Sequence, residues 1–150
     1  MKVKYLALVM LFILTSCMPC IGKKEGINYA STASSLTDID QKIKSYYLTR
    51  DIPDNFDESQ YKSVANELCS SNPVCKSQIE ELFDTYNVQV RKIDDTFSVL
   101  LCDVDKSKKI MEDFGCNSML VEIKSWEEND TAPCAFEDNW QQVLQQYCEE

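Results

Sequence analysis

Histidine is absent from this 150-residue sequence, and glycine occurs only three times. Without an imidazole the chain cannot build a Ser-His-Asp or Cys-His nucleophile system, or a zinc site that needs histidine. With so little glycine it has no glycine-rich phosphate-binding loop. The cysteines that follow residue 22 include no C-x-x-C pair of the zinc or thioredoxin type. We therefore predict no enzyme activity, no metal site and no cofactor.

Long apolar runs are missing as well, except for one near the N-terminus. Tyr5 to Thr15 is an apolar run of eleven residues that follows Lys2 and Lys4, which is typical of a secretory signal peptide. At about 1.5 Å per residue it would cover only about 16 Å of a hydrocarbon core about 30 Å thick, so we predict no membrane span. Residues 1–22 are the predicted signal peptide; cleavage after Cys17 is nearly as good. We expect a secreted, extracellular protein.

Cysteine parity supports this boundary. Removing residues 1–22 discards Cys17 and Cys20 and leaves six of the eight cysteines: Cys69, Cys75, Cys102, Cys116, Cys134 and Cys148. An even number after a signal peptide predicts three disulfides formed in an oxidising compartment. An alternative remains open, because Leu14-Thr15-Ser16-Cys17 looks like a bacterial lipobox. The protein would then be a lipid-anchored bacterial lipoprotein with Cys20 as an odd seventh thiol.

The charge is strongly negative. The full chain carries a formal net charge of −10, and cleavage would remove two lysines and no acid, leaving thirteen basic and twenty-five acidic residues and a net charge of −12. Such a surface repels phosphate backbones and anionic lipid headgroups, so we predict no nucleic-acid partner. Solubility is the simplest role of this acidity.

Helical spacing and capping residues organise the rest of the chain. Residues 23–34 are polar and small, and we predict a flexible arm there, followed by a single cysteine-rich domain over 35–150. Ser35 is the expected N-cap of a first helix that ends before Asp51. A second helix is expected to start after Asp57, with Gln60 reaching back to the cap and Phe56 and Tyr61 forming a hydrophobic staple; a third starts with Asn72 as N-cap and Pro73 at its first position.

The third segment carries the longest helical pattern. Its apolar residues are separated mainly by three or four positions: Ile79, Leu82, Phe83, Tyr86, Val90, Ile93, Phe97, Leu100, Leu101 and Val104. This spacing predicts one long amphipathic helix over 73–104, with a kink near Asp94-Asp95. Shorter helices are expected over about 106–114, with Gly115 as its C′ residue, over about 117–126 and over about 136–148. The predicted fold is an all-α, disulfide-stapled bundle of five or six helices.

Six cysteines allow fifteen disulfide pairings. On one continuous helix Cys75 and Cys102 would be about 40 Å apart, far beyond the roughly 7 Å limit for a disulfide. Cys134 and Cys148 are disfavoured for the same reason. A local bridge between Cys69 and Cys75 across the break at Pro73 is possible, and the connectivity otherwise stays open.

Three short sequences carry candidate chemistry. Asn129-Asp130-Thr131 is a glycosylation sequon, so Asn129 is the predicted acceptor. Residues 103–107 begin like a calcium loop, but Lys108 and Phe114 stand where the turn glycine and the bidentate glutamate are needed, so we reject it. The acid pairs at 94–95 and 127–128 are expected to be solvated rather than catalytic.

The aromatic residues suggest a possible second function. Their spacing predicts that they face the interior of the fold: Tyr46, Tyr47, Tyr61, Phe83, Tyr86, Phe97, Phe114, Trp126, Phe136, Trp140 and Tyr147. They could line a pocket for a small hydrophobic ligand, although packing in a core is the commoner role of such residues. A hydrophobic-ligand carrier is therefore kept as an alternative.

The last third of the chain resembles a known family. The insect odorant-binding proteins are set aside because their C-x3-C and C-x8-C spacings are missing. Asp113-Phe114-Gly115-Cys116, Val121-Glu122-Ile123, Cys134, Trp140 and Cys148 look like the end of the nematode secreted cysteine-rich domain named domain of unknown function nineteen. The chain has fewer cysteines before Cys69 and a longer gap after Cys116 than that pattern. The resemblance implies a secreted, cysteine-rich, helical protein and supplies no catalytic residues.

These observations together predict a secreted, non-enzymatic, disulfide-stabilised helical protein. Its acidic surface and lack of catalytic groups favour extracellular binding, with another protein as the expected partner.

Overall fold

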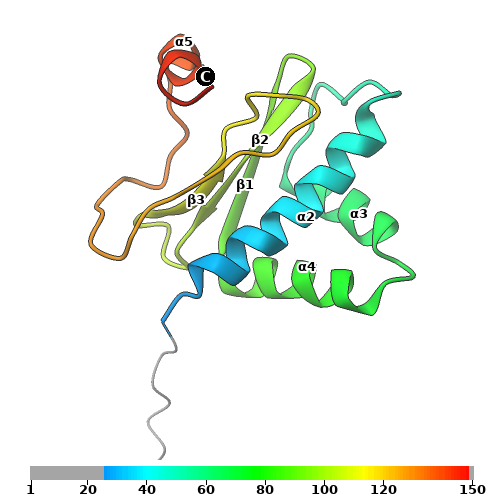
Figure 1. Ribbon diagram of the computed structural model, residues 1–150, viewed down its shortest axis with the longest axis horizontal. Helices are drawn as coiled ribbons and strands as arrows, with labels where there is room; N and C mark the ends of the chain where they lie inside the picture. Colours follow the sequence, from blue (N-terminus) through cyan, green and yellow to red (C-terminus); the bar gives the residue numbers. More distant parts are fainter. Residues whose placement is uncertain (1–25, 149–150) are drawn as a thin grey trace, which may run out of the picture.

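The computed structural model describes residues 26–148. Three helices come first, then four strands, and finally one short helical segment (Figure 1). The elements are α2 (Tyr29–Tyr47), α3 (Glu58–Leu68), α4 (Pro73–Thr85), β1 (Asn87–Ile93), β2 (Thr96–Cys102), β3 (Lys109–Asp113), β4 (Ile123–Ser125), α5 (Trp140–Val143) and the π-helical turn η1 (Leu144–Cys148). The strands form one antiparallel sheet in the order β1-β2-β3-β4. Among the residues described, no helix combines the length and apolar character needed to cross a bilayer.

The prediction of an all-α bundle is wrong, because the described chain is a mixed α/β fold in which helices pack on a four-stranded sheet. The error begins in the segment 73–104. Helix α4 ends at Thr85, and β1 and β2 follow as a hairpin closed by the two-residue turn Asp94-Asp95, with Asp94 at a positive φ of 45°. The expected helix kink is therefore a strand reversal.

The physical reason lies in the burial of β2. Every residue of β2 is buried, so the strand is a nearly continuous apolar run without alternation. In β1, Val88 and Val90 do alternate with polar residues, but the pattern is short. Taken together, the apolar residues of the two strands are separated mainly by three or four positions, which is also the spacing of an amphipathic helix. Their many β-branched residues and the acidic turn between them are the local features that favour a hairpin.

The helices predicted after residue 104 are also wrong or misplaced. The segments expected to be helical at 106–114 and 117–126 contain β3, a loop and β4, and the final helix begins only at Trp140. Gly115 does adopt a positive φ of 69°, but after a strand rather than a helix. A Cβ atom there would lie 2.3 Å from the carbonyl oxygen of Phe97, so the backbone passes too close to β2 for any other residue.

The capping residues predict two of the three N-terminal helix starts correctly. The side chain of Asp57 accepts a hydrogen bond from the Gln60 amide at 3.1 Å, and Asn72 caps α4 with Pro73 in its first turn. Helix α2 starts earlier than predicted, with Asn28 as its cap in place of Ser35, which is buried inside the helix. Residues 29–34 of the expected arm are therefore helical.

The three long helices cover one face of the sheet (Figure 1). The strand register places Val88 beside Leu101 and Leu101 beside Met111 on this face. Leu36, Ile43 and Ile79 of the helices are at most 1% exposed in the shared core. Phe97 lies at its centre and packs against Phe56 and Tyr61, with ring centroids 5.3 and 5.9 Å away. This layer is an ordinary hydrophobic core.

The C-terminal segment, which we define as residues 126–148, contacts the opposite face. Arg91, Leu100 and Glu112 lie on that face because they alternate with the core residues of their strands. The guanidinium of Arg91 lies 4.5 Å from the ring centroid of Phe136, and Cys102 is bonded to Cys134. The sheet thus lies between a helical layer and a largely irregular one.

Candidate functional site

Four buried polar residues lie between α2, α3 and β3. Lys44 is paired with Asp113, with Nζ and Oδ2 2.8 Å apart and both side chains 1% exposed. The hydroxyl of Tyr61 donates a hydrogen bond to Asp40, which is fully buried. Lys44 also donates to the carbonyl oxygen of Leu120 at 2.7 Å. This buried ionic cluster links two helices to the sheet and to the loop that follows β3.

The cluster contains two carboxyl groups and one ammonium group. Burial and the negative charge of Asp113 raise the pKa of Asp40 well above its usual value, while the hydrogen bond from Tyr61 and the positive charge of Lys44 oppose that shift. A protonated Asp40 leaves Lys44 and Asp113 as a balanced pair, which is the arrangement that a water-free interior favours. Because Asp40 and Asp113 are sealed from solvent, the cluster is structural and closed to substrates from solution.

A second charged group lies on the other face of the sheet. Lys109 is paired with Glu112 at 2.9 Å, with side chains 2% and 0% exposed, and reaches Glu137 of the C-terminal segment at 3.4 Å. Burial raises the pKa of Glu112, and its bond to Lys109 partly offsets the rise. These contacts help to hold the C-terminal segment on the sheet.

Neither buried group was predicted from the sequence, although the residues of the first one carried a visible pattern. Asp40 and Lys44 are four residues apart and fall on the same helical stripe as Leu36 and Ile43. Polar residues on an apolar stripe indicate a buried pair or network. For Lys109 and Glu112 no such pattern existed, since their strand was predicted as a helix.

The six predicted cysteines form three disulfides: Cys69–Cys75, Cys102–Cys134 and Cys116–Cys148. The expected local bridge across Pro73 is among them. Cys75 and Cys102 are not paired, but the reason given from the sequence was wrong, because the two cysteines are not on one helix. The protein is therefore disulfide-stabilised, with two of its bridges linking the sheet region to the C-terminal segment.

The other candidate residues lie apart from one another. Asn129 is exposed in the turn after β4, and its glycosylation stays a prediction. Asp103 closes the turn between β2 and β3 by accepting bonds from the amides of Ser107 and Lys108 at 2.6 and 3.1 Å. Although partial burial raises the pKa of Asp103, these bonds and that of the Ser107 hydroxyl lower it overall. Asp94-Asp95 and Glu127-Glu128 are exposed acid pairs in turns.

The clefts of the described residues do not resemble a hydrophobic ligand site. One of about 690 Å³ lies between the end of α2 and the β1–β2 turn, and one of about 650 Å³ follows β1. Both open to solvent, and charged side chains line them, among them Arg50 and Asp51 in the first and Glu58 and Lys62 in the second. A carrier needs an enclosed, mostly apolar cavity.

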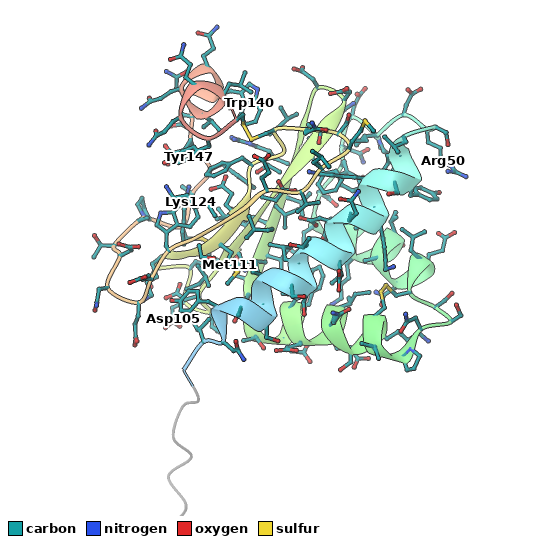
Figure 2. The ribbon with its side chains drawn as sticks, in the orientation of Figure 1. Arg50, Asp105, Met111, Lys124, Trp140 and Tyr147 are labelled. Atoms are coloured by element: carbon teal, nitrogen blue, oxygen red, sulfur yellow. A yellow bond between two sulfur atoms is a disulfide. The ribbon has the colours of Figure 1, made fainter. Side chains whose placement is uncertain are left out.

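Several of the predicted aromatic residues pack against one another instead. Tyr147 stacks on Phe114 with centroids 4.4 Å apart, and Lys124 lies 4.2 Å from the Tyr147 centroid (Figure 2). The ring of Trp126 packs edge to face against Phe114, with the two centroids 6.2 Å apart. The rings therefore fill space in the fold and leave no aromatic pocket among these residues.

Exposed apolar side chains gather beside the C-terminal half of α2. Leu48, Met119 and Leu120 are 53, 60 and 58% exposed. Gln41 donates to the carbonyl oxygen of Met119 at 2.8 Å, which holds the 117–122 loop against the helix. Leu48 lines the same cleft as Ser118 of this loop. Arg50 follows the end of α2, and its guanidinium is stacked 4.3 Å from the ring centroid of Tyr46 (Figure 2). We call three of these residues the α2 surface: Leu48, Met119 and Leu120.

Some sequence predictions lie outside the described residues. The signal peptide over 1–22, and the lipobox alternative with Cys17 and Cys20, fall before residue 26. No protein-family model matches the chain, and comparison with curated proteins and with solved structures finds no significant match.

Proposed function

We propose that the protein is exported and acts outside the cell by binding another protein, without catalysing a reaction. The observation that carries this proposal is the α2 surface, where Leu48, Met119 and Leu120 are each more than half exposed. Single exposed apolar residues are common, but neighbouring ones on a disulfide-stabilised domain indicate a contact surface. Methionine is also one of the residue types enriched at protein interfaces.

The α2 surface is already ordered in the free chain. Lys44 of the buried ionic cluster donates to the carbonyl oxygen of Leu120, and the side chain of Asn117 accepts from the amides of Met119 and Leu120 at 2.7 and 3.2 Å. A loop fixed in this way loses little conformational entropy when a partner binds. This favours recognition by a pre-formed surface.

Export is supported by the three disulfides, which are typical of oxidising compartments. Intact mass of the secreted protein, before and after reduction, tests this part together with N-terminal sequencing. We expect an N-terminus near residue 23 and the gain of two hydrogens for each of three disulfides. A mature chain with six free thiols would contradict the proposal, and a lipid on Cys17 would favour the lipoprotein alternative.

Site-specific photo-crosslinking tests the binding surface. A photoreactive residue would replace Leu120, and a control protein would carry it at Val104, which is also exposed but lies in the β2–β3 turn. In extracellular fluid of the source we expect a discrete adduct only from position 120. Excess wild-type protein should compete for it, and the double variant Met119→Asp, Leu120→Asp should not. Equal adducts at both positions, or equal competition by the double variant, would contradict the proposal.

A further inference from the structure

The buried ionic cluster holds an amine and a carboxyl group in contact. Nζ of Lys44 on α2 lies 2.8 Å from Oδ2 of Asp113 on β3, and both side chains are 1% exposed. Since the cluster is closed to substrates from solution, the only reaction open to this pair is one between its own side chains. An amine and a carboxylic acid condense to an amide with the loss of water. The pair therefore contains both reactants of a crosslink between the helix and the sheet.

Both reacting groups are held in place by a second hydrogen bond. Lys44 donates to the carbonyl oxygen of Leu120 at 2.7 Å, and Oδ1 of Asp113 accepts from the backbone amide of Gly115 at 3.0 Å. A fixed N–H donor at Oδ1 stabilises the negative charge that develops there when a nucleophile attacks the carboxyl carbon. The amide is fixed because the backbone of Gly115 passes so close to Phe97 that a Cβ atom would not fit.

Asp40 is placed to carry protons for this reaction. It is fully buried, and the hydroxyl of Tyr61 donates to its Oδ1. Burial, the charge of Asp113 and a side-chain hydrogen bond between the two acids raise the pKa of Asp40. A protonated Asp40 thus contacts the carboxyl group from which an oxygen atom has to leave. A buried acid in this position can act as a general acid and then as a general base.

We propose that Lys44 and Asp113 condense to form an isopeptide bond, with Asp40 as the acid–base group, so that α2 is covalently joined to β3. The reaction is a single self-modification of the chain. It goes beyond the binding function proposed above and does not depend on it.

The reaction balances without another reactant. One proton passes from the Lys44 ammonium to the Asp113 carboxylate, which gives an amine and an acid. The lone pair of Nζ then forms a bond to the carboxyl carbon of Asp113. Asp40 gives its proton to Oδ2 as the bond between that oxygen and the carbon breaks, and it regains a proton from the nitrogen. The products are one amide and one water molecule, and Asp40 ends protonated, as it began.

The product fits the same hydrogen-bond partners. The remaining N–H of the amide keeps the carbonyl oxygen of Leu120 as its acceptor, and the amide oxygen keeps the N–H of Gly115 as its donor. Two buried charges, which are costly in a water-free interior, disappear. Well-oriented groups react as if their concentration were about 10⁵–10⁸ M, so a reaction that is very slow between free groups in water becomes accessible here.

The other buried ion pair lacks these features. Lys109 and Glu112 are 2.9 Å apart, with side chains 2% and 0% exposed. However, Oε1 of Glu112 has no hydrogen-bond partner, and the nearby acid Glu137 is 56% exposed. This pair has neither a fixed donor for the developing charge nor a buried acid to carry protons. It therefore provides an internal control in which no bond is expected.

Intact mass of the wild-type protein, after reduction and alkylation of its cysteines under denaturing conditions, tests the proposal. We expect a mass lower by one water molecule than that of the matching Lys44→Arg variant, after allowance for the substitution. Trypsin does not cleave after an acylated lysine, so tandem mass spectrometry of a digest should find one branched peptide that contains Lys44 and Asp113. A wild-type chain at its full sequence mass would overturn the inference, and this measurement does not depend on the folding of any variant.

Matched variants identify the groups that react. Lys109→Arg should leave the water loss unchanged, as should Asp38→Asn on the exposed side of α2. Asp40→Asn keeps the shape of the side chain but cannot carry a proton, so the crosslinked fraction of freshly made protein should rise at least about 100-fold more slowly. A water loss that persists in Lys44→Arg, or a folded Asp40→Asn variant that crosslinks at the wild-type rate, would contradict the assigned roles.

Discussion

The two layers that cover the sheet are stabilised in different ways. The helical layer buries apolar side chains from α2, α3 and α4, and its disulfide, Cys69–Cys75, spans only six positions. In the C-terminal segment, Val143 is the only side chain among residues 126–148 that is fully buried, and two disulfides that each span 32 positions connect it to the rest. The same sheet is thus covered by a hydrophobic layer and by a crosslinked one.

This difference shows that disulfides can replace the burial of apolar surface in holding a segment on the sheet. Regular helices repeat an apolar stripe, so they bury enough surface to stay in place. An irregular segment has few such residues and loses more entropy for each contact it makes. Long-span disulfides, charged pairs such as Lys109–Glu137 and the aromatic stack at Tyr147 supply the attachment instead.

The largest loss of stability is expected from truncating the central residue of the helical layer. Phe97→Ala removes a ring that is 0% exposed and contacts Phe56, Tyr61 and Lys44. We expect a loss of about 3–5 kcal/mol in the free energy of unfolding, measured by urea denaturation. A loss below about 1 kcal/mol would mean that the helical layer is not the principal source of stability.

Removing single disulfides sharpens the comparison. Loop-entropy arguments give about 4 kcal/mol for a bridge that spans 32 positions and about 2 kcal/mol for one that spans six. The pair Cys102→Ser, Cys134→Ser should therefore destabilise the protein more than the matched pair Cys69→Ser, Cys75→Ser. We also expect only the first pair to accelerate amide exchange in residues 135–148. The reverse order in urea midpoints would contradict this account.

A smaller effect is expected from the buried ionic cluster, and it depends on pH. Because the pKa of Asp40 is raised in the folded state, the folded protein binds this proton more tightly than the unfolded chain. Its contribution to stability is therefore full at pH values below the usual carboxyl pKa and is lost as the pH rises through the folded-state value. Asn mimics the protonated carboxyl, so we expect Asp40→Asn to gain stability relative to wild type as the pH rises, by on the order of 1 kcal/mol.

Asp38→Asn is the control for this prediction, since Asp38 is exposed on the same helix. Urea midpoints of the three proteins, measured from about pH 4 to pH 8, provide the comparison. A constant difference between Asp40→Asn and wild type across this range would show that Asp40 does not hold a proton in the folded protein.

The smallest effect is expected in the crosslinked layer. Tyr147→Ala removes a half-buried ring that stacks on Phe114 and lies under Lys124. With Cys116–Cys148 intact, we expect a loss of only about 1 kcal/mol, as for one aromatic pair. If the loss equalled that of Phe97→Ala, the two layers would not differ in the way described.

The sequence predicts some of these features and misses others for identifiable reasons. Caps act locally, so Asp57 and Asn72 mark helix starts correctly. The all-buried strand β2 depends on partners distant in the chain, and the spacing of its apolar residues matched a helix as well as a hairpin. The three disulfides could be counted from the sequence and the local bridge Cys69–Cys75 suggested, but the other two could not be paired. The α2 surface could not be predicted at all, because Met119 and Leu120 lie beside α2 only after the 117–122 loop folds back on the helix.

The turn at Glu127–Asp130 is exposed, and both long-span disulfides hold the chain that follows it. If an extracellular protease nicked this turn, residues 131–148 would stay attached through Cys134 and Cys148. The nicked molecule would run as one band on a non-reducing gel and as two after reduction. The protein would thus survive a break in its backbone as a single particle.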